Sequence, residues 1–418
     1  MHQPVRLVRN LSFVVVTLIM TLSFQRSASA IDGTPTWLYS PVGAPPANMF
    51  ISSPSLAFDH YGVPSVAWSV THNTGVGNTV YRSNTSGLGF WTHHTVEATT
   101  GAGILTSLSF DRSERPTVAW VNGDGVVKTL FNNTTLQTIA ASGANVNRPA
   151  LTISHDLTGT LRGIYSTQTA GGMMGFSGAN GSHTTGSLGT LPGVSNVFDL
   201  RLTTDHTGRR HAIAGARLTS GANAVIVASE PISGGSWTSS ILATADDVKG
   251  VAIATSPTDG KIALAYTTLD STTNTSRLMY AKSTGTMLVT TQVQSSTTAV
   301  FEDIDLAFDR SDGRPAIAYE QKVTSPFAQQ IQFAYMNASS VWQTSLIDAT
   351  ASLDNAMGLP RRPSLAFDDY GTSWPAVAYI DADGSLMVAF DPPGAAPEPA
   401  ALALLAMCVF PLARRRRA

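Results

Sequence analysis

The sequence predicts an all-β protein whose body consists of seven copies of one repeat, and three observations support this prediction. A Leu-Ala-Phe-Asp motif, followed by a turn with Gly and Pro and by a second apolar run, is clearest at residues 55–68, 306–319 and 365–379. Looser copies fill the rest of the body at a spacing of about 50 residues. Within each copy, short apolar runs are separated by Gly, Asn, Asp and Pro, which is typical of strands joined by turns.

The turn after the first predicted strand of each copy gives the count of seven. These turns are centred on Asp59, Asp111, Asp156, Asp205, Ser256, Asp309 and Asp368. An Asp side chain accepts hydrogen bonds from turn amides and Gly adopts positive φ, so both residue types serve the turn. Aromatic residues also recur at fixed positions. We expect them to pack between copies, because every copy needs such packing whereas an active site would be unique.

Each copy is predicted to form four antiparallel strands. In the first copy they span residues 55–59, 64–70, 78–83 and 90–97, and in the sixth copy residues 304–309, 315–320, 330–336 and 341–348. A unit of four antiparallel strands and about 50 residues is one blade of a β-propeller, and a ring of such blades leaves only short exposed edges. The predicted fold is therefore a single seven-bladed β-propeller over residues 31–393.

The ring is predicted to close through the N-terminal segment. The seventh copy ends at Phe390 after three strands, and residues 37–42 supply a spare strand. That strand begins with Trp37 and carries an aliphatic residue five positions on, as do the predicted fourth strands that contain Trp91 and Val96, Trp237 and Leu242, and Trp342 and Ile347. Pro41 cannot donate a ladder hydrogen bond, which suits an outermost strand.

Residues 1–30 have the features of a secretory signal peptide. Arg6 and Arg9 form a positive region, residues 11–24 are largely apolar, and Ala28 and Ala30 provide a small-x-small cleavage site. We expect the mature chain to begin near Ile31, outside the cytoplasm. The alternative is a buried N-terminal helix.

Residues 394–418 contain three features in a fixed order: Pro397, Glu398 and Pro399, then an apolar run over 400–413, then Arg414, Arg415, Arg416 and Arg417. The run of about 14 apolar residues is short for a membrane span, which needs roughly 20. The arginines favour the cytoplasmic side. This segment resembles the PEP-CTERM sorting signal of Gram-negative bacteria.

The resemblance implies that an exosortase-type enzyme recognises Pro397, Glu398 and Pro399 and that the tail is removed after export. It implies transient membrane association through the tail, and a location at the cell surface or outside the cell. The alternative is a C-terminal anchor that is never processed.

Composition excludes several classes of function. Charged residues make up 13% of the chain and the formal net charge is −2, so no basic excess favours nucleic acid as a partner. The single cysteine, Cys408, lies in the tail, which leaves no disulfide or thiolate site in the body. No glycine-rich phosphate loop opens a helix, and we predict no cofactor.

Charged residues gather at one level of the predicted ring. Alignment of the seven first strands places Ser53, Leu105, Arg148, Asp199, Gly250, Asp303 and Arg362 together at one mouth of the channel. Arg148, Asp199, Asp303 and Arg362 are the candidate polar group of this mouth. Two interpretations remain open: Arg–Asp pairing, or a bound cation, for which Ca²⁺ is the ion suited to oxygen ligands.

The predicted function is an exported, non-catalytic surface or matrix protein that binds a glycan or a protein through one face of the propeller. The connections between second and third strands and those between blades vary in sequence, and both emerge on the same face. Binding sites are common on loops held by a rigid scaffold. One alternative is a polysaccharide hydrolase or lyase with paired carboxylates at the channel mouth. Another is a purely structural matrix component.

No catalytic residue is predicted. Propeller sialidases carry a Ser-x-Asp-x-Gly-x-Thr-Trp turn, whereas residues 83–91 keep the Ser, Gly and Trp but lack the Asp. A Ser–His–Asp set can be assembled from any Ser-rich chain and is not specific.

Overall fold

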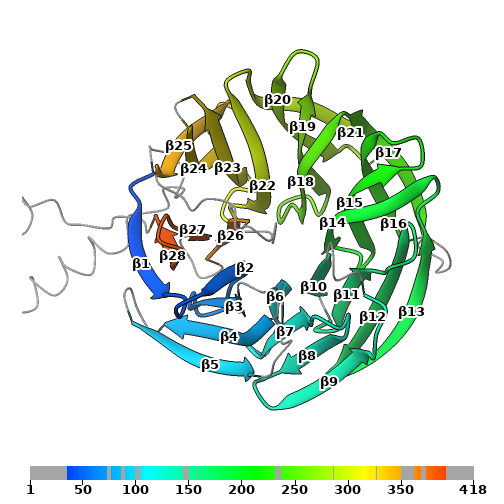
Figure 1. Ribbon diagram of the computed structural model, residues 1–418, viewed down its shortest axis with the longest axis vertical. Helices are drawn as coiled ribbons and strands as arrows, with labels where there is room; N and C mark the ends of the chain where they lie inside the picture. Colours follow the sequence, from blue (N-terminus) through cyan, green and yellow to red (C-terminus); the bar gives the residue numbers. More distant parts are fainter. Residues whose placement is uncertain are drawn as a thin grey trace, which may run out of the picture.

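The computed structural model describes residues 35–391, apart from residues 73–76, 86–89, 99–102, 104, 145–149, 157, 231–236, 286, 326, 350–361 and 369–372. The described residues form seven four-stranded antiparallel sheets arranged as a ring (Figure 1) and contain no helix. The prediction of an all-β, seven-bladed propeller is confirmed. In the described part of the chain, no helix has the length and apolar character needed to cross a membrane.

The first four blades contain the following strands: β2 (Met49–Phe58), β3 (Pro64–His72), β4 (Gly77–Thr85) and β5 (Trp91–Glu97); β6 (Leu105–Phe110), β7 (Pro116–Val121), β8 (Val127–Phe131) and β9 (Thr135–Ala140); β10 (Leu151–His155), β11 (Leu161–Ser166), β12 (Gly172–Ala179) and β13 (Ser182–Thr190); and β14 (Val194–Thr204), β15 (Arg210–Leu218), β16 (Asn223–Ser229) and β17 (Thr238–Ala245).

The last three blades contain β18 (Asp247–Thr255), β19 (Ile262–Asp270), β20 (Thr275–Ser283) and β21 (Leu288–Ser296); β22 (Ala299–Phe308), β23 (Pro315–Thr324), β24 (Phe327–Met336) and β25 (Trp342–Asp348); and β26 (Ser364–Phe367), β27 (Pro375–Ile380) and β28 (Leu386–Phe390) together with β1 (Leu38–Gly43). In every blade the first of these strands lies nearest the centre of the ring (Figure 1).

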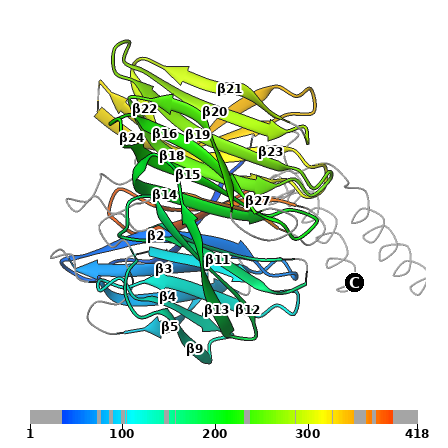
Figure 2. The ribbon, with the colours of Figure 1, turned by 90° about the vertical axis from the view of Figure 1, so that its right-hand side faces the viewer.

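Strands run through the thickness of the ring, from one face to the other (Figure 2). Because neighbouring strands are antiparallel, the turns after the first strands share one face, here called the turn face. The connections from second to third strands lie on the opposite face, here called the loop face.

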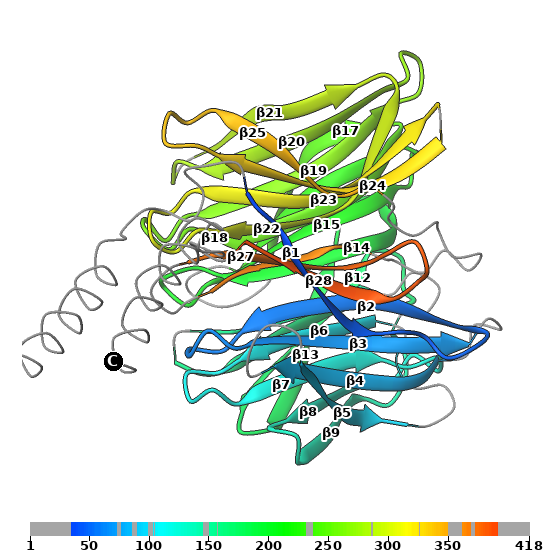
Figure 3. The same ribbon diagram turned by 90° about the vertical axis from the view of Figure 1, so that its left-hand side faces the viewer.

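Ring closure by the N-terminal strand is also confirmed. β1 pairs antiparallel with β28 and is the outermost strand of the last blade (Figure 3). Trp37 is 9% exposed, packs edge-on against Phe333 at 5.2 Å between ring centroids, and donates its Nε1–H to Ser345 Oγ at 3.3 Å. The Tyr39 hydroxyl donates to the Ile347 carbonyl at 2.7 Å. The strand therefore joins the sixth blade to the seventh as well as completing the seventh.

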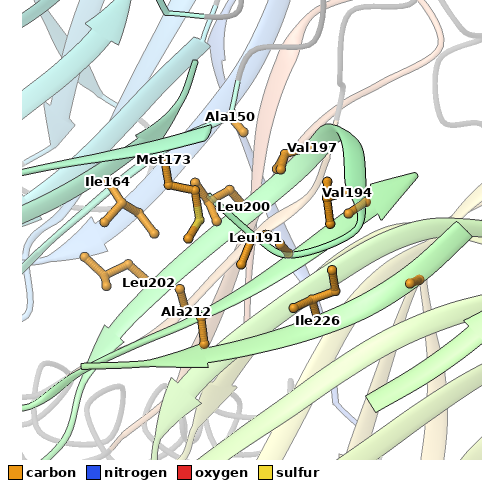
Figure 4. Packing of buried hydrophobic residues seen from close by; sticks show 14 residues of the cluster. Ala150, Ile164, Met173, Leu191, Val194, Val197, Leu200, Leu202, Ala212 and Ile226 are labelled. Carbon is orange, nitrogen blue, oxygen red and sulfur yellow. The ribbon is translucent and has the colours of Figure 1, made fainter. Parts of the chain in front are cut away.

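The hydrophobic core lies between blades. In one cluster, Ile164 and Met173 of the third blade pack with Leu200, Leu202 and Ile226 of the fourth (Figure 4). Most of the aromatic residues that recur along the sequence are buried in such clusters, as expected: Phe58, Phe308, Phe367, Trp68, Trp120, Tyr266, Tyr319 and Tyr379. Phe110 is only partly buried and packs against the cluster between the first and second blades. Each blade thus buries its apolar faces against its neighbours, which explains why the residues repeat.

The repeated turns are built as the sequence predicts. Asp111 Oδ1 accepts backbone hydrogen bonds from Ser113 at 2.8 Å and Arg115 at 2.9 Å. The turns at Asp59, Asp156 and Asp205 are made in the same way. Gly62 adopts φ of 75° in the first turn, and Glu114 takes the equivalent place in the second at φ of 63°. Residues other than glycine rarely adopt this backbone conformation. The Glu114 carboxylate accepts a hydrogen bond from the His60 amide, which holds the side chain in place.

Several strands are longer than predicted. β22 begins at Ala299 rather than at residue 304, and the register shifts between Glu302 and Ile304. β2 begins at Met49, with a similar shift between Ser52 and Ser55. A bulge inserts an extra residue, which inverts the alternation of side chains between the two faces of the strand. The alternating pattern in the sequence is interrupted at that residue although the strand continues, so the predicted strands are too short.

Candidate functional site

The first strands of adjoining blades are joined by side-chain oxygens that accept backbone hydrogen bonds from the next strand, a set here called the inner belt. Its members are Ser55 with Leu108 N at 2.9 Å, Ser107 with Ile153 N at 3.1 Å, Asp199 with Val251 N at 3.0 Å, Asp305 with Leu365 N at 2.8 Å, and Ser364 with Leu56 N at 2.9 Å. An innermost strand has one edge without a partner strand, and the belt satisfies amides of that edge.

Three of the four predicted channel residues meet in a cluster of ion pairs. Arg362 Nη1 lies 2.5 Å from Asp199 Oδ1, and Arg362 Nε lies 3.7 Å from Asp303 Oδ1. Arg201 Nε, which the sequence analysis did not single out, lies 3.8 Å from Asp199 Oδ1. The fourth predicted residue, Arg148, lies outside the described residues. We call Asp199, Arg201, Asp303, Asp305 and Arg362 the ion-pair cluster.

Burial shapes the electrostatics of this cluster. It raises the pKa of Asp303 to about 6, because removal from water outweighs the attraction of Arg362. Burial likewise raises the pKa of Asp305 and lowers the pKa of Arg201. For Arg362 burial alone would lower the pKa, but Asp199 and Asp303 outweigh it and the pKa is raised.

The geometry shows Arg–Asp pairing at this level of the ring. Asp199 offers one carboxylate oxygen to Arg362 and the other to the Val251 amide. Among the described residues, no group of three or more His, Cys, Asp or Glu side chains is arranged to hold a metal ion.

A central cavity of about 1190 Å³ opens on the turn face. Its walls include Phe58, Phe110, Phe308 and Phe367, which are repeated residues at the ends of the first strands. The ion-pair cluster lies at its inner end, since Asp305 directly precedes wall residue Leu306 in β22. A separate void of about 20 Å³ is bordered by Asp199, Arg201 and Arg362.

Side chains that can donate or accept hydrogen bonds surround the mouth of this cavity: His60, Arg112, Glu114, His155, His206 and Arg310. Burial lowers the pKa of His155 to about 4, so its imidazole is neutral near pH 7, and Ser109 Oγ lies 3.0 Å from its Nδ1. The sequence analysis treated these turns as structural and missed the mouth that they form.

Carboxylates at the mouth have partners. Asp111 pairs with Arg115 at 2.6 Å, Asp156 with Arg162 at 3.1 Å, and Asp259 with Lys282 at 3.0 Å. Burial opposes ionisation of Asp111 and Asp156, but hydrogen bonds from Arg115 and from Thr158 respectively help to outweigh it, so the pKa of each is lowered. These groups are ionised near pH 7 and paired within their own blades.

One set of residues has the composition of a catalytic triad. His211 Nδ1 lies 2.8 Å from Ser229 Oγ, and its Nε2 lies 3.0 Å from Asp205 Oδ2. In the third blade, Arg162 follows Asp156 by the same six residues and donates to the same carboxylate oxygen. His211 therefore replaces a turn-bracing arginine, and we interpret this set as structural.

A second pocket, of about 370 Å³, lies at the loop-face end of the third blade. We call it the third-blade pocket, and its lining includes Ser142, Gly143, Tyr165, Thr169, Met173 and Thr190. It lies at the connection between β11 and β12. The predicted loop face thus carries a hollow, although the larger cavity opens on the turn face.

No protein-family model and no curated protein matches the chain. Solved structures share its architecture. A protein of unknown function from Dyadobacter fermentans is 10% identical with a TM-score of 0.52, over 84% of this chain and 97% of that one. BBS1N, solved in complex with ARL6DN, is 10% identical with a TM-score of 0.52, over 86% of this chain and 98% of that one. The chain is thus similar to other propellers in fold.

Proposed function

We propose that this protein is an exported, non-catalytic binding protein that holds a glycan in its central cavity. The observation that carries the proposal is the cavity of about 1190 Å³, with phenylalanine side chains in its walls and imidazole and guanidinium groups at its mouth. Ligand sites typically combine apolar and aromatic walls with a few placed polar groups. A glycan matches this combination, because each sugar ring presents both C–H faces and hydroxyl groups.

A catalytic role has less support. Glycoside hydrolysis requires one carboxyl group that stays protonated and a second that acts as base or nucleophile. At the mouth, the pKa values of Asp111, Asp156 and Asp205 are lowered and each carboxylate has a basic partner. In the ion-pair cluster, the carboxyl group of Asp303, whose pKa is raised to about 6, is paired with Arg362. The pKa values of Asp381 and Asp391 are also raised to about 6, but these residues do not line the cavity. These pairings favour binding without turnover.

Export and sorting form the second part of the proposal. Residues 1–30 serve as the signal peptide, with cleavage after Ala30, and residues 394–418 serve as the sorting segment. An exosortase-type enzyme recognises Pro397–Pro399, and Arg414–Arg417 stop transfer until the tail is removed. The protein then lies at the surface or outside a Gram-negative-type cell. This part rests on the resemblance of the two terminal segments, which lie outside the described residues.

A glycan array with the mature chain, followed by calorimetry on the glycans retained, tests the binding proposal. The Ala307→Trp variant places an indole inside the central cavity, where Ala307 lines the wall. The Val289→Trp variant adds the same group on the outer strand β21, where Val289 is exposed.

We expect Ala307→Trp to weaken glycan binding at least tenfold and Val289→Trp to leave it unchanged, with both variants folded by circular dichroism. Wild-type affinity in Ala307→Trp, or no glycan bound by the mature chain, would contradict the proposal.

Sorting is tested separately in a host that carries an exosortase-type enzyme. Mass spectrometry of the surface fraction should find wild-type chains that end before the apolar run and Glu398→Ala chains that retain it. Wild-type chains that keep the full tail would show an anchor instead.

A further inference from the structure

We propose that the third-blade pocket is a second binding site, for a neutral sugar residue, with Tyr165 as its central hydrogen-bonding group. This site is separate from the central cavity, lies on the opposite face, and deepens the proposed function by naming an uncharged sugar as the ligand class.

The first step of the argument compares one position in every blade. The large aromatic residue at the fifth position of the second strand has a hydrogen-bond partner in five blades. The pairs are Trp68 with Ser83 at 2.9 Å, Trp120 with Glu97 at 2.6 Å, Tyr266 with Thr290, Tyr319 with Gln294 at 2.5 Å, and Tyr379 with Asp348. The fourth blade has Ala214 at this position, which has no side-chain polar atom.

Tyr165 departs from this pattern. It is only 3% exposed, yet its hydroxyl has no hydrogen-bond partner among the described residues. The hydroxyl oxygen itself is not fully enclosed, so it reaches the open space of the pocket. Its ring is fixed by the core, with Phe176 at 6.5 Å between centroids, and the side chain forms part of the pocket wall. The unpaired hydroxyl is therefore presented to whatever occupies the pocket.

Burial determines the chemical form of this hydroxyl. It raises the pKa of Tyr165 above its ordinary value, so the group remains protonated near pH 7 and can both donate and accept. That dual capacity matches a sugar hydroxyl, which also donates and accepts.

The remaining lining supports an uncharged ligand. Every lining side chain that the structure describes is neutral, with hydroxyls from Ser142, Thr169 and Thr190 and an apolar patch from Met173 and Met174. A charged ligand would lose water here without gaining a counter-charge from the lining. A sugar ring can place its hydroxyls against the first group and its C–H face against the methionines.

Size and backbone exposure agree with this assignment. The volume of about 370 Å³ lies at the small end of ligand pockets, which span roughly 300–1000 Å³, and suits one or two sugar rings. Gly143 and Gly189 adopt φ of 102° and 92°, and a Cβ atom at either would meet no atom within 4 Å. The backbone at both glycines therefore borders open space in the pocket wall.

The test uses a panel of neutral methyl glycosides and disaccharides, with uronic acids and sulfated sugars as charged comparators, measured by calorimetry on the mature chain. Tyr165→Phe removes the hydroxyl and keeps the ring. We expect it to bind the preferred neutral sugar about tenfold more weakly, with an unchanged melting temperature because no protein partner is lost.

Tyr319→Phe is the matched control, because its hydroxyl is bonded within the protein. It should bind the sugar as tightly as wild type and melt at a lower temperature. Ser142→Trp, at an exposed residue of the pocket, should abolish binding by filling the space.

Ala307→Trp separates the two sites. If it removes binding to the array glycans but leaves the neutral-sugar affinity intact, the sites are independent. If it has no effect on either, the central-cavity proposal fails and this one stands. Our inference is overturned if no neutral sugar binds at millimolar concentration, if Tyr165→Phe and Ser142→Trp both bind like wild type, or if charged sugars are preferred.

Discussion

The inner belt and the third-blade pocket are both built from the repeated blades, but their polar groups differ in whether they have hydrogen-bond partners within the protein. In the belt, Ser107 and Asp305 each accept an amide hydrogen bond from the next blade, and the polar groups of both partners are satisfied within the protein. In the third-blade pocket, the hydroxyl of the buried residue Tyr165 has no partner among the described residues.

This difference separates closure from binding. A ring must join every blade to the next, so polar groups that serve closure are paired and recur around it. A ligand site needs a group left unpaired until the ligand arrives, and such a group stands out as an exception to the repeat. Removing a closure group should therefore lower stability, whereas removing the Tyr165 hydroxyl should not.

The largest loss of stability is expected at the closing strand. Trp37→Ala should lower the free energy of unfolding by about 3–5 kcal/mol, because it empties a buried site against Phe333 and loses the bond to Ser345. Urea denaturation measures this value. Leu38→Ala, at a side chain that is 38% exposed on the same strand, is the control and should cost much less. Equal effects would mean that Trp37 does not lock the ring.

The ion-pair cluster should come next. Arg362→Met removes the guanidinium paired with Asp303 and leaves Asp199 with only the more distant Arg201, and we expect a loss of about 3–4 kcal/mol by urea denaturation. The double variant Asp199→Asn with Arg362→Met removes one uncompensated charge, so it should be more stable than the sum of the single losses predicts. Strict additivity would show that the pairs do not interact in solution.

A single belt residue should have a moderate effect. Ser107→Ala leaves the buried Ile153 amide without its acceptor and should cost about 1–3 kcal/mol in the same assay. Ser142→Ala removes an equivalent hydroxyl from the third-blade pocket and should change stability by less than about 0.5 kcal/mol. Similar costs for the two serines would remove the distinction between closure and binding groups.

The smallest effect concerns pH. The pKa of Asp303 in the folded state, about 6, exceeds its ordinary value of 3.8, so the folded state binds more protons between these two pH values. Stability from this group is therefore present below about pH 4 and lost as pH rises to about 6. The free energy of unfolding of Asp303→Asn should therefore rise relative to that of wild type across that interval. The expected change is on the order of 1 kcal/mol, because the side chain is 21% exposed and solvent screens part of the effect.

The comparison is made by urea denaturation at several pH values between 4 and 7. The pKa of His155 is lowered to about 4 in the folded state, which has the opposite sign and makes stability fall as pH decreases from 6.5. That contribution is common to wild type and variant and cancels in their difference. A difference that does not change with pH would show that Asp303 has an ordinary pKa.

Much of the architecture follows from local signals in the sequence. The turns at Asp59 and Asp309 mark the blades, and the spacing after Trp37 identifies a strand that belongs to the distant β28. Aligning the repeats also predicts that Asp199, Asp303 and Arg362 meet, although they are far apart in the chain. The bulges that lengthen β2 and β22 were not predicted, because an inserted residue interrupts the alternation.

The candidate sites were harder to predict than the fold. The mouth of the central cavity consists of turn residues such as His60 and His206, whose repetition favoured a structural interpretation. Tyr165 sits at a packing position shared with other blades, and its sequence context does not distinguish it from Tyr319. What differs is the hydrogen-bond partner, which for Tyr319 comes from the preceding blade.

By itself, the sequence determined the number of blades, the order of strands and the segment that closes the ring, because these depend on periods and turn chemistry within one copy. Only the tertiary structure decided which polar groups find partners and where space remains, because both depend on distances between blades. Pockets and unpaired hydroxyls arise where the side chains of two neighbouring blades leave space unfilled or hydrogen bonds unmade. The pattern of residues within one copy does not specify these contacts between blades.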